Sequence, residues 1–135
     1  MSRLLAAAEA EIGTRFVPQG RLAGIGLDCV GLAAVAARAC GVDVESREDY
    51  SLTGSDYSEM LLDYMRRNCH QVSADAAQSG DFLLFWINKP NKPRHLGILA
   101  DTQHFIHTND SVGRVTKTIF DGRWRKRVHS AWRLN

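Results

Sequence analysis

Cys29, His95 and His107 have the side-chain types that amide hydrolysis by a thiol requires. Cys29 follows Asp28, a residue type that caps helices, and it opens a run of small residues predicted to form a helix that ends at Gly41. A helix dipole favours negative charge at its N-terminus, so we expect a lowered thiol pKa for Cys29. We therefore interpret Cys29 as a candidate nucleophile. The alternative is a small, buried apolar side chain.

The two histidines come from neighbouring predicted strands. His95 opens the apolar run LGILA, and His107 follows in the segment HFIHTND. If these strands form a hairpin around residues 101–103, the two imidazoles become cross-strand neighbours. His95 would then donate the proton to the leaving amine, while His107 would fix the tautomer and orientation of His95. His104 lies at an odd offset from His107 and is expected at the surface.

Other polar groups have weaker claims on the chemistry. The backbone N–H of Cys29 is the candidate donor to the oxyanion that forms during amide hydrolysis. Asp28 could be a catalytic acid, but capping the helix is the simpler role. His70 and His129 lack a supporting pattern and are expected to be structural or exposed.

The elements that must position these residues change from helical to strand-like along the chain. Three helices are predicted, at residues 2–12 with Ser2 as the cap, at 29–40 and at 56–68. A loop is expected at 14–27 and a polar connection at 42–55. Strands are predicted at 82–87, 96–100, 105–108, 112–119 and 129–134. This order predicts a single α+β domain over residues 1–135, with the helices on one face of an antiparallel β-meander.

Composition excludes several classes of protein. The chain has 135 residues and a net charge of only +2, so nothing in its charge predicts a nucleic-acid partner. Three cysteines without metal-ligand spacing predict neither a disulfide framework nor a metal or cofactor site. Cys40 and Cys69 are expected to be buried or half-buried thiols. Neither an export signal nor a membrane span is predicted, because no apolar stretch is long enough.

A basic cluster lies near the C-terminal end. Arg123, Arg125, Lys126 and Arg127 surround Trp124. Such a combination suits an anionic surface or a partner protein. The alternative is a solvated turn before the last strand, with Trp124 in the core.

Several short motifs together resemble the NlpC-type family of cell-wall cysteine endopeptidases. They are GTRF at 13–16, DCVGL at 28–32, GDFLLF at 80–85, HLGI at 95–98 and, finally, His107. The resemblance implies a papain-like fold with Cys29 as nucleophile, His95 as base and His107 as the third member of the triad. It also places Asp28 and Phe16 at the oxyanion and substrate side of the site. Phe16 stands where many relatives have tyrosine, and Arg15 where they have proline.

The sequence is most similar to the short phage-tail and gene-transfer-agent branch of that family, on the segments Trp124–Arg127 and Ala131–Arg133. This resemblance implies cleavage of the peptidoglycan stem peptide, typically at the γ-D-glutamyl bond to a diamino acid. It further implies a protein made in the cytoplasm without a signal peptide and carried to the wall by a tail or secretion apparatus. The alternatives are a secreted antibacterial amidase effector with the same triad and a non-catalytic tail-assembly protein.

Overall fold

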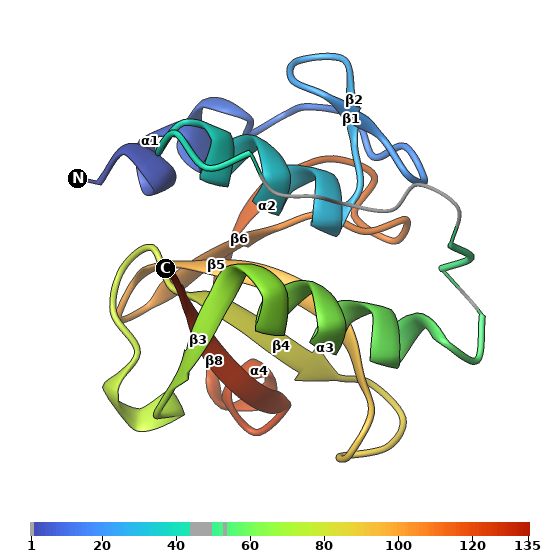
Figure 1. The fold of residues 1–135 in the computed structure, drawn as a ribbon, viewed down its shortest axis with the longest axis vertical. Coiled ribbons are helices and arrows are strands. Elements are labelled where there is room, and N and C mark those ends of the chain that lie inside the picture. Colours follow the sequence, from blue (N-terminus) through green and yellow to red (C-terminus); the bar gives the residue numbers. More distant parts are fainter. Residues whose placement is uncertain (1, 44–49, 53) are drawn as a thin grey trace.

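The computed structural model describes residues 2–43, 50–52 and 54–135, so part of the connection predicted at 42–55 lies outside the described residues. The helices are α1 (Arg3–Ala10), α2 (Cys29–Arg38), α3 (Tyr57–Asn68), the 3₁₀ turn η1 (Ala74–Ala76) and α4 (Gly122–Arg125). The strands are β1 (Arg21–Leu22), β2 (Gly26–Leu27), β3 (Cys69–Val72), β4 (Phe82–Trp86), β5 (Pro93–Asp101), β6 (His104–His107), β7 (Thr116–Ile119) and β8 (Val128–Leu134). Figure 1 shows their arrangement.

The predicted helices form where their caps place them. Ser2 accepts a hydrogen bond from the Leu5 N–H, and Asp28 accepts one from the Gly31 N–H, so both predicted N-caps are confirmed. Gly31 also lets a loop lie directly on α2, because a Cβ there would stand 1.9 Å from the carbonyl oxygen of Gly20. The sequence between the first two helices is thereby held against the start of α2.

The main sheet has six antiparallel strands in the order β3-β8-β4-β5-β6-β7. Strands β4 to β7 form the predicted meander. The prediction is wrong for the last strand, because β8 returns across the sheet and lies between β3 and β4. An ion pair supports this return: buried Asp81 at the start of β4 accepts two hydrogen bonds from Arg133 of β8, at 2.8 and 2.9 Å.

Other differences from the predicted elements are local. The sequence did not indicate the short β1–β2 hairpin, the edge strand β3 or the single turn of α4. The strand predicted at 112–119 begins only at Thr116, since the chain turns at Gly113, whose φ is +80°. Strand β5 is longer than predicted and starts at Pro93, where a strand tolerates proline.

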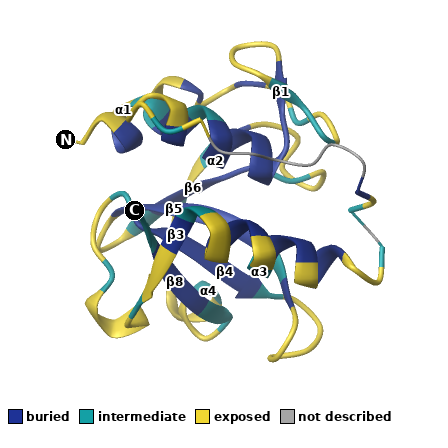
Figure 2. Cartoon of the chain, viewed as in Figure 1, coloured by how far each residue is buried: buried dark blue, intermediate teal, exposed yellow. Residues whose placement is uncertain are grey.

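Side chains alternate between the two faces of the sheet and build two apolar clusters. The larger cluster joins α1, α2 and α3 to one face, as Figure 2 shows by their buried inner sides. The smaller cluster lies on the other face, where Phe85 and Phe105 pack against Trp124 of α4. The prediction that the N-terminal helices lie on one face is therefore confirmed for α1 to α3, whereas α4, which the sequence did not indicate, lies on the other face.

Candidate active site

Cys29 is the first residue of α2, and its side chain is 5% exposed. Its sulfur lies 3.2 Å from the hydroxyl of Tyr57 on α3. The backbone groups of Leu96 and Val30 also donate hydrogen bonds to the sulfur. The pairing of β5 with β6 reaches no further than Ile98, which leaves the Leu96 N–H beyond that ladder and available to the sulfur.

The protonation of Cys29 differs from the sequence-based expectation. Burial and the negative charge of Asp28 raise the pKa of the thiol to about 12. The donors from Tyr57, Leu96 and Val30 act in the opposite direction but are outweighed. The expected lowering of the pKa by the helix start is therefore wrong, and Cys29 is a neutral thiol at pH 7.

The two candidate histidines meet in the fold. Nε2 of His95 lies 2.8 Å from Nδ1 of His107, and Nε2 of His107 lies 2.9 Å from Oγ1 of Thr118 on β7. Within the described part of the chain, Nδ1 of His95 has no hydrogen-bond partner. We assign a tautomer in which His95 donates from Nε2 to His107, which in turn donates to Thr118. That assignment leaves Nδ1 of His95 as a proton acceptor.

Both imidazoles are buried among aromatic rings, with Trp124 on α4 lying 5.9 Å from His95 and 5.3 Å from His107 between ring centroids. Burial and, to a lesser extent, the neighbouring His107 lower the pKa of His95 to about 3. Burial alone lowers the pKa of His107 to about 4. Both histidines are neutral at pH 7, so Nδ1 of His95 has a lone pair that can accept a proton, while burial disfavours the imidazolium that would result.

A cleft of about 210 Å³ brings the candidate nucleophile and base together. Its lining residues are Phe16, Asp28, Cys29, Leu52, Tyr57, Arg94, His95, Thr108, Asn109 and Asp110. His107 does not line this cleft and reaches it only through His95. The arrangement can bind an extended substrate over a thiol, with a neutral imidazole beside it.

Asp28 lies at the cleft but has no free carboxylate oxygen for substrate. Its oxygens accept hydrogen bonds from the backbone of Gly31 and Gln19, at 2.8 and 2.9 Å, and from Arg21 at 3.0 Å. The hydroxyl of Tyr50 also donates to the carboxylate. Asp28 therefore fixes the start of α2 and the loop beside it, which is the capping role preferred from the sequence.

The sequence did not indicate two residues of this site, Tyr57 and Thr118. Tyr57 belongs to the apolar stripe of α3, and only the packing of α3 against β5 brings its hydroxyl to the sulfur. Thr118 is one of two alternating threonines on β7, a pattern that does not reveal which strand lies beside it. Phe16 is half-buried in the cleft and has no hydroxyl, so Tyr57 supplies the phenolic group at the sulfur.

Other sequence-based expectations have mixed outcomes. His104 pairs with Asp101 at the surface, as expected. Cys69 is buried, but the expectation for Cys40 is wrong because it lies exposed just past the end of α2. Among residues 2–43, 50–52 and 54–135, no group of three potential ligands could hold a metal ion. No helix in those same ranges is long and apolar enough to cross a membrane.

The basic residues around Trp124 divide into two kinds. Arg125 donates to the carbonyl of Thr102, and Arg127 donates to that of Ile87 at 2.7 Å, so both attach α4 and its flank to neighbouring loops. Arg123 and Lys126 are exposed and make no such contact with the described residues. Trp124 packs in the smaller core cluster, as the alternative interpretation of this segment expected.

Comparisons with known proteins extend this picture. A model of the NlpC/P60 family matches residues 13–133. No curated protein matches the sequence significantly. Among solved structures, an NlpC/P60 family protein from Bacillus cereus superposes with a TM-score of 0.73 at 17% identity. The match covers 98% of this chain and 39% of the Bacillus cereus chain.

Two mycobacterial structures are also similar in fold. The peptidoglycan hydrolase RipB from Mycobacterium tuberculosis superposes with a TM-score of 0.68 at 17% identity. The match covers 98% of this chain and 64% of the RipB chain. RipD from the same organism is described as a non-catalytic NlpC/p60 domain protein adapted to peptidoglycan binding. It superposes with a TM-score of 0.64 at 12% identity, and the match covers 98% of this chain and 94% of RipD. The chain therefore spans well under two thirds of some relatives and nearly all of others.

Proposed function

Because the chain belongs to the NlpC/P60 family, we propose that this peptidoglycan hydrolase-like domain is an active stem-peptide endopeptidase with a Cys29–His95–His107 triad. The observation that carries the proposal is the shared cleft of Cys29 and His95, with His95 held by a 2.8 Å hydrogen bond to His107. The description of RipB as a peptidoglycan hydrolase supports the substrate class.

The protonation states are those from which a general-base mechanism starts. Cys29 starts as a thiol and His95 as a neutral imidazole, since burial disfavours the charged form of each. As the sulfur attacks the scissile carbonyl, its proton passes to Nδ1 of His95. The hydrogen bond that His95 donates to Nδ1 of His107 then stabilises the imidazolium, and the hydrogen bond from His107 to Thr118 keeps His107 in the tautomer that can accept it.

The remaining steps follow from the same groups. His95 returns the proton to the leaving amine as the carbon–nitrogen bond breaks, which leaves a thioester on Cys29. Water then attacks the thioester with His95 as base, and hydrolysis restores the thiol and releases the acid. The Tyr57 hydroxyl, 3.2 Å from the sulfur, lies close enough to donate to the nearby oxyanion. We assign the scissile bond as γ-D-glutamyl to a diamino acid, on the motif resemblance alone.

The test is digestion of purified muropeptides followed by mass spectrometry. The proposal expects new products that end at the γ-D-glutamyl residue. Cys29→Ala should abolish them, and His95→Ala should slow their release by about 10²–10⁴-fold, the usual contribution of general acid–base catalysis. Circular dichroism verifies that both variants are folded. Undiminished product release by folded Cys29→Ala protein would refute the proposal.

A non-catalytic role is the second candidate. The buried, neutral thiol of Cys29 and the fold shared with non-catalytic RipD favour it. It expects peptidoglycan binding without any product in the same digestion. The complete set of Cys29, His95 and His107, joined through one cleft and one hydrogen bond, favours the enzyme.

We extend the proposal to delivery by a phage tail or a tail-like particle, so that the protein acts on the wall while attached to its carrier. The motif resemblance of Trp124–Arg127 and Ala131–Arg133 supports this extension. A secretion apparatus carrying an antibacterial amidase is the alternative. Arg123 and Lys126 are the candidate carrier contacts, because Arg125 and Arg127 already bind the protein's own loops.

The double variant Arg123→Glu/Lys126→Glu tests this extension. It should reduce incorporation into particles, or binding to isolated walls, more than it reduces cleavage of a small soluble stem peptide. Unchanged incorporation and unchanged wall binding would place the carrier contact elsewhere.

A further inference from the structure

A tight turn between β4 and β5 holds two lysines side by side. The backbone N–H of Lys92 donates to the carbonyl of Lys89 at 3.0 Å, closing a four-residue turn with Pro90 in its second position. Proline is favoured there because its fixed φ matches the turn. Such a turn keeps its first and last Cα atoms within about 7 Å of each other. Two ammonium groups are thereby concentrated on one short loop.

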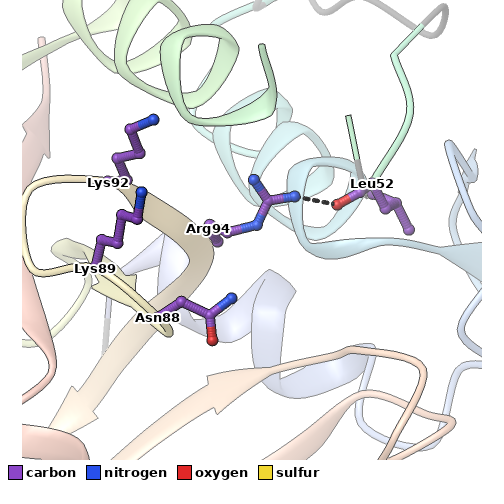
Figure 3. A pocket seen from close by; sticks show the side chains of 5 residues that line it. All are labelled: Leu52, Asn88, Lys89, Lys92 and Arg94. Atoms are coloured by element: carbon purple, nitrogen blue, oxygen red, sulfur yellow. Dashed lines mark hydrogen bonds between the residues drawn. The ribbon is translucent and has the colours of Figure 1, made fainter. Parts of the chain in front are cut away.

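These lysines face a cavity of about 450 Å³ that adjoins the active-site cleft. The cavity is lined by Leu52, Asn88, Lys89, Lys92 and Arg94. Leu52 and Arg94 also line the cleft of Cys29, so the two hollows share a wall. Figure 3 shows Lys89 and Lys92 on one side and Leu52 on the other, with Arg94 between them.

Arg94 is fixed in place, whereas Lys89 and Lys92 have no side-chain partner among the described residues. The Arg94 guanidinium donates to the carbonyl of Leu52 at 2.8 Å and stacks on Tyr57, with 5.4 Å between the guanidinium carbon and the ring centroid. Lys89 and Lys92 are exposed, and neither forms an ion pair with a described residue. Among the described residues that line the cavity, none is acidic. Among the described residues of this cavity, three positive charges therefore lie together without a compensating carboxylate.

We propose that this cavity is a subsite for a free carboxylate of the stem peptide close to the scissile bond. The inference rests on the proposed function and adds a selectivity to it. The carboxylate belongs to the peptide because the wall shared with the Cys29 cleft places the cations within the reach of one bound substrate. Arg94 immediately precedes His95 and contacts Tyr57, so an anion held there lies beside the reacting groups. Lys89 and Lys92 supply mobile donors that adapt to the carboxylate.

The experiment uses synthetic L-Ala-γ-D-Glu-diaminopimelate peptides in which each free carboxylate is converted in turn to the carboxamide. Binding is measured by calorimetry on Cys29→Ala protein, so that it does not depend on hydrolysis. We expect one amidation to weaken binding about tenfold, as for two exposed charge pairs. The double variant Lys89→Gln/Lys92→Gln is made in the same Cys29→Ala background. It should weaken binding of the free-acid peptide by a similar factor and leave unchanged the binding of the carboxamide that wild-type lysines bind less well. Arg66→Gln, an exposed cation on α3, is the control.

Three outcomes would overturn the subsite. Equal binding of the acid and of every amide would remove the selectivity. Loss of affinity for the amide as well as the acid in the lysine variant would give the lysines a role unrelated to the carboxylate. Tighter binding of glycerol 3-phosphate than of the free-acid peptide would mean that the cations of this cavity form a phosphate site. Failure of the wild-type protein to cleave a peptide that it binds with the expected selectivity would refute the endopeptidase function alone.

Discussion

The Cys29 sulfur lies in surroundings that stabilise and penalise its charge at the same time. Tyr57, Leu96 and Val30 direct donors at it, while burial and Asp28 raise its pKa to about 12. The sequence shows the helix start that favours a thiolate, but not the depth at which the sulfur lies. A free thiolate is therefore rare at pH 7, and the proposed mechanism activates the sulfur by proton transfer to His95 once substrate is bound.

Tyr57 is predicted to assist the thiol directly. Tyr57→Phe removes a donor that lowers the pKa of Cys29, so the pKa should rise and alkylation of Cys29 at a fixed pH should slow. Turnover should fall by about tenfold, the cost of one hydrogen bond to a charged group. Stopped-flow alkylation in a Cys40→Ser background and peptide kinetics measure the two effects.

Tyr64→Phe is the matched control for this prediction. Tyr64 lies on the same helix, and among the described residues its buried hydroxyl has no hydrogen-bond partner. Equal effects of the two substitutions on alkylation would mean that packing, rather than the Tyr57 hydroxyl, controls the thiol.

Thr118 is predicted to orient the histidine pair. Thr118→Val removes the acceptor for Nε2 of His107 while keeping the shape of the side chain. A lower kcat, by about three- to tenfold, with little change in KM is expected, because the group acts through His95 on the transition state. Thr116→Val on the same strand is the control, since the Thr116 hydroxyl donates to the carbonyl of Arg114 and, in the described part of the chain, forms no hydrogen bond with either histidine. A rise in KM at constant kcat would instead place Thr118 in substrate binding.

At the scale of elements, α4 packs over the histidine pair and covers it with Trp124. Its Asp121 cap accepts from the N–H groups of Arg123 and Trp124, and this single turn sets the indole against Phe85, Phe105 and both imidazoles. Four residues are too few for a helical periodicity, so the sequence could not indicate this element. The strands β4 and β5 are predictable because their apolar runs are long and bounded by turns.

This cover makes the stability of the fold depend on pH. Both histidines have folded pKa values, about 3 and about 4, below the ordinary value of 6.5. The unfolded chain therefore binds more protons between those values, and the free energy of unfolding falls as pH decreases from about 6.5. The loss is at most roughly 1.4 kcal/mol per pH unit for each histidine.

Trp124→Ala should flatten this dependence, because water reaches the imidazoles and their pKa values rise toward 6.5. Urea unfolding measures the free energy of unfolding at pH 7.0 and at pH 5.0. The difference between these two free energies should be smaller in the variant than in the wild type, even though the variant is less stable at both pH values. His70→Gln, a change of an exposed histidine, serves as the control. An unchanged difference in Trp124→Ala would mean that α4 does not keep the pair neutral.

For the whole molecule, the order of motifs was sufficient to predict the family, the α+β class, the helix that carries Cys29 and the partnership of His95 with His107. The path of β8 was not predictable, because alternation within a strand does not reveal its neighbour. Contacts between distant segments place Tyr57 and Thr118 at the site and form the cavity that Lys89, Lys92 and Arg94 line. The sequence pattern therefore identified the candidate site residues, while their protonation and supporting contacts required the packed fold.

The most direct test of the central claim, that Cys29 is the nucleophile, is the order in which two reagents label the thiols. Iodoacetamide should modify exposed Cys40 first, because Cys29 and Cys69 are buried with raised pKa values. An L-Ala-γ-D-Glu chloromethyl ketone should reverse that order and modify Cys29 first, since binding places its electrophile at the sulfur. Tandem mass spectrometry locates each label. Modification of Cys40 ahead of Cys29 by both reagents would contradict the account.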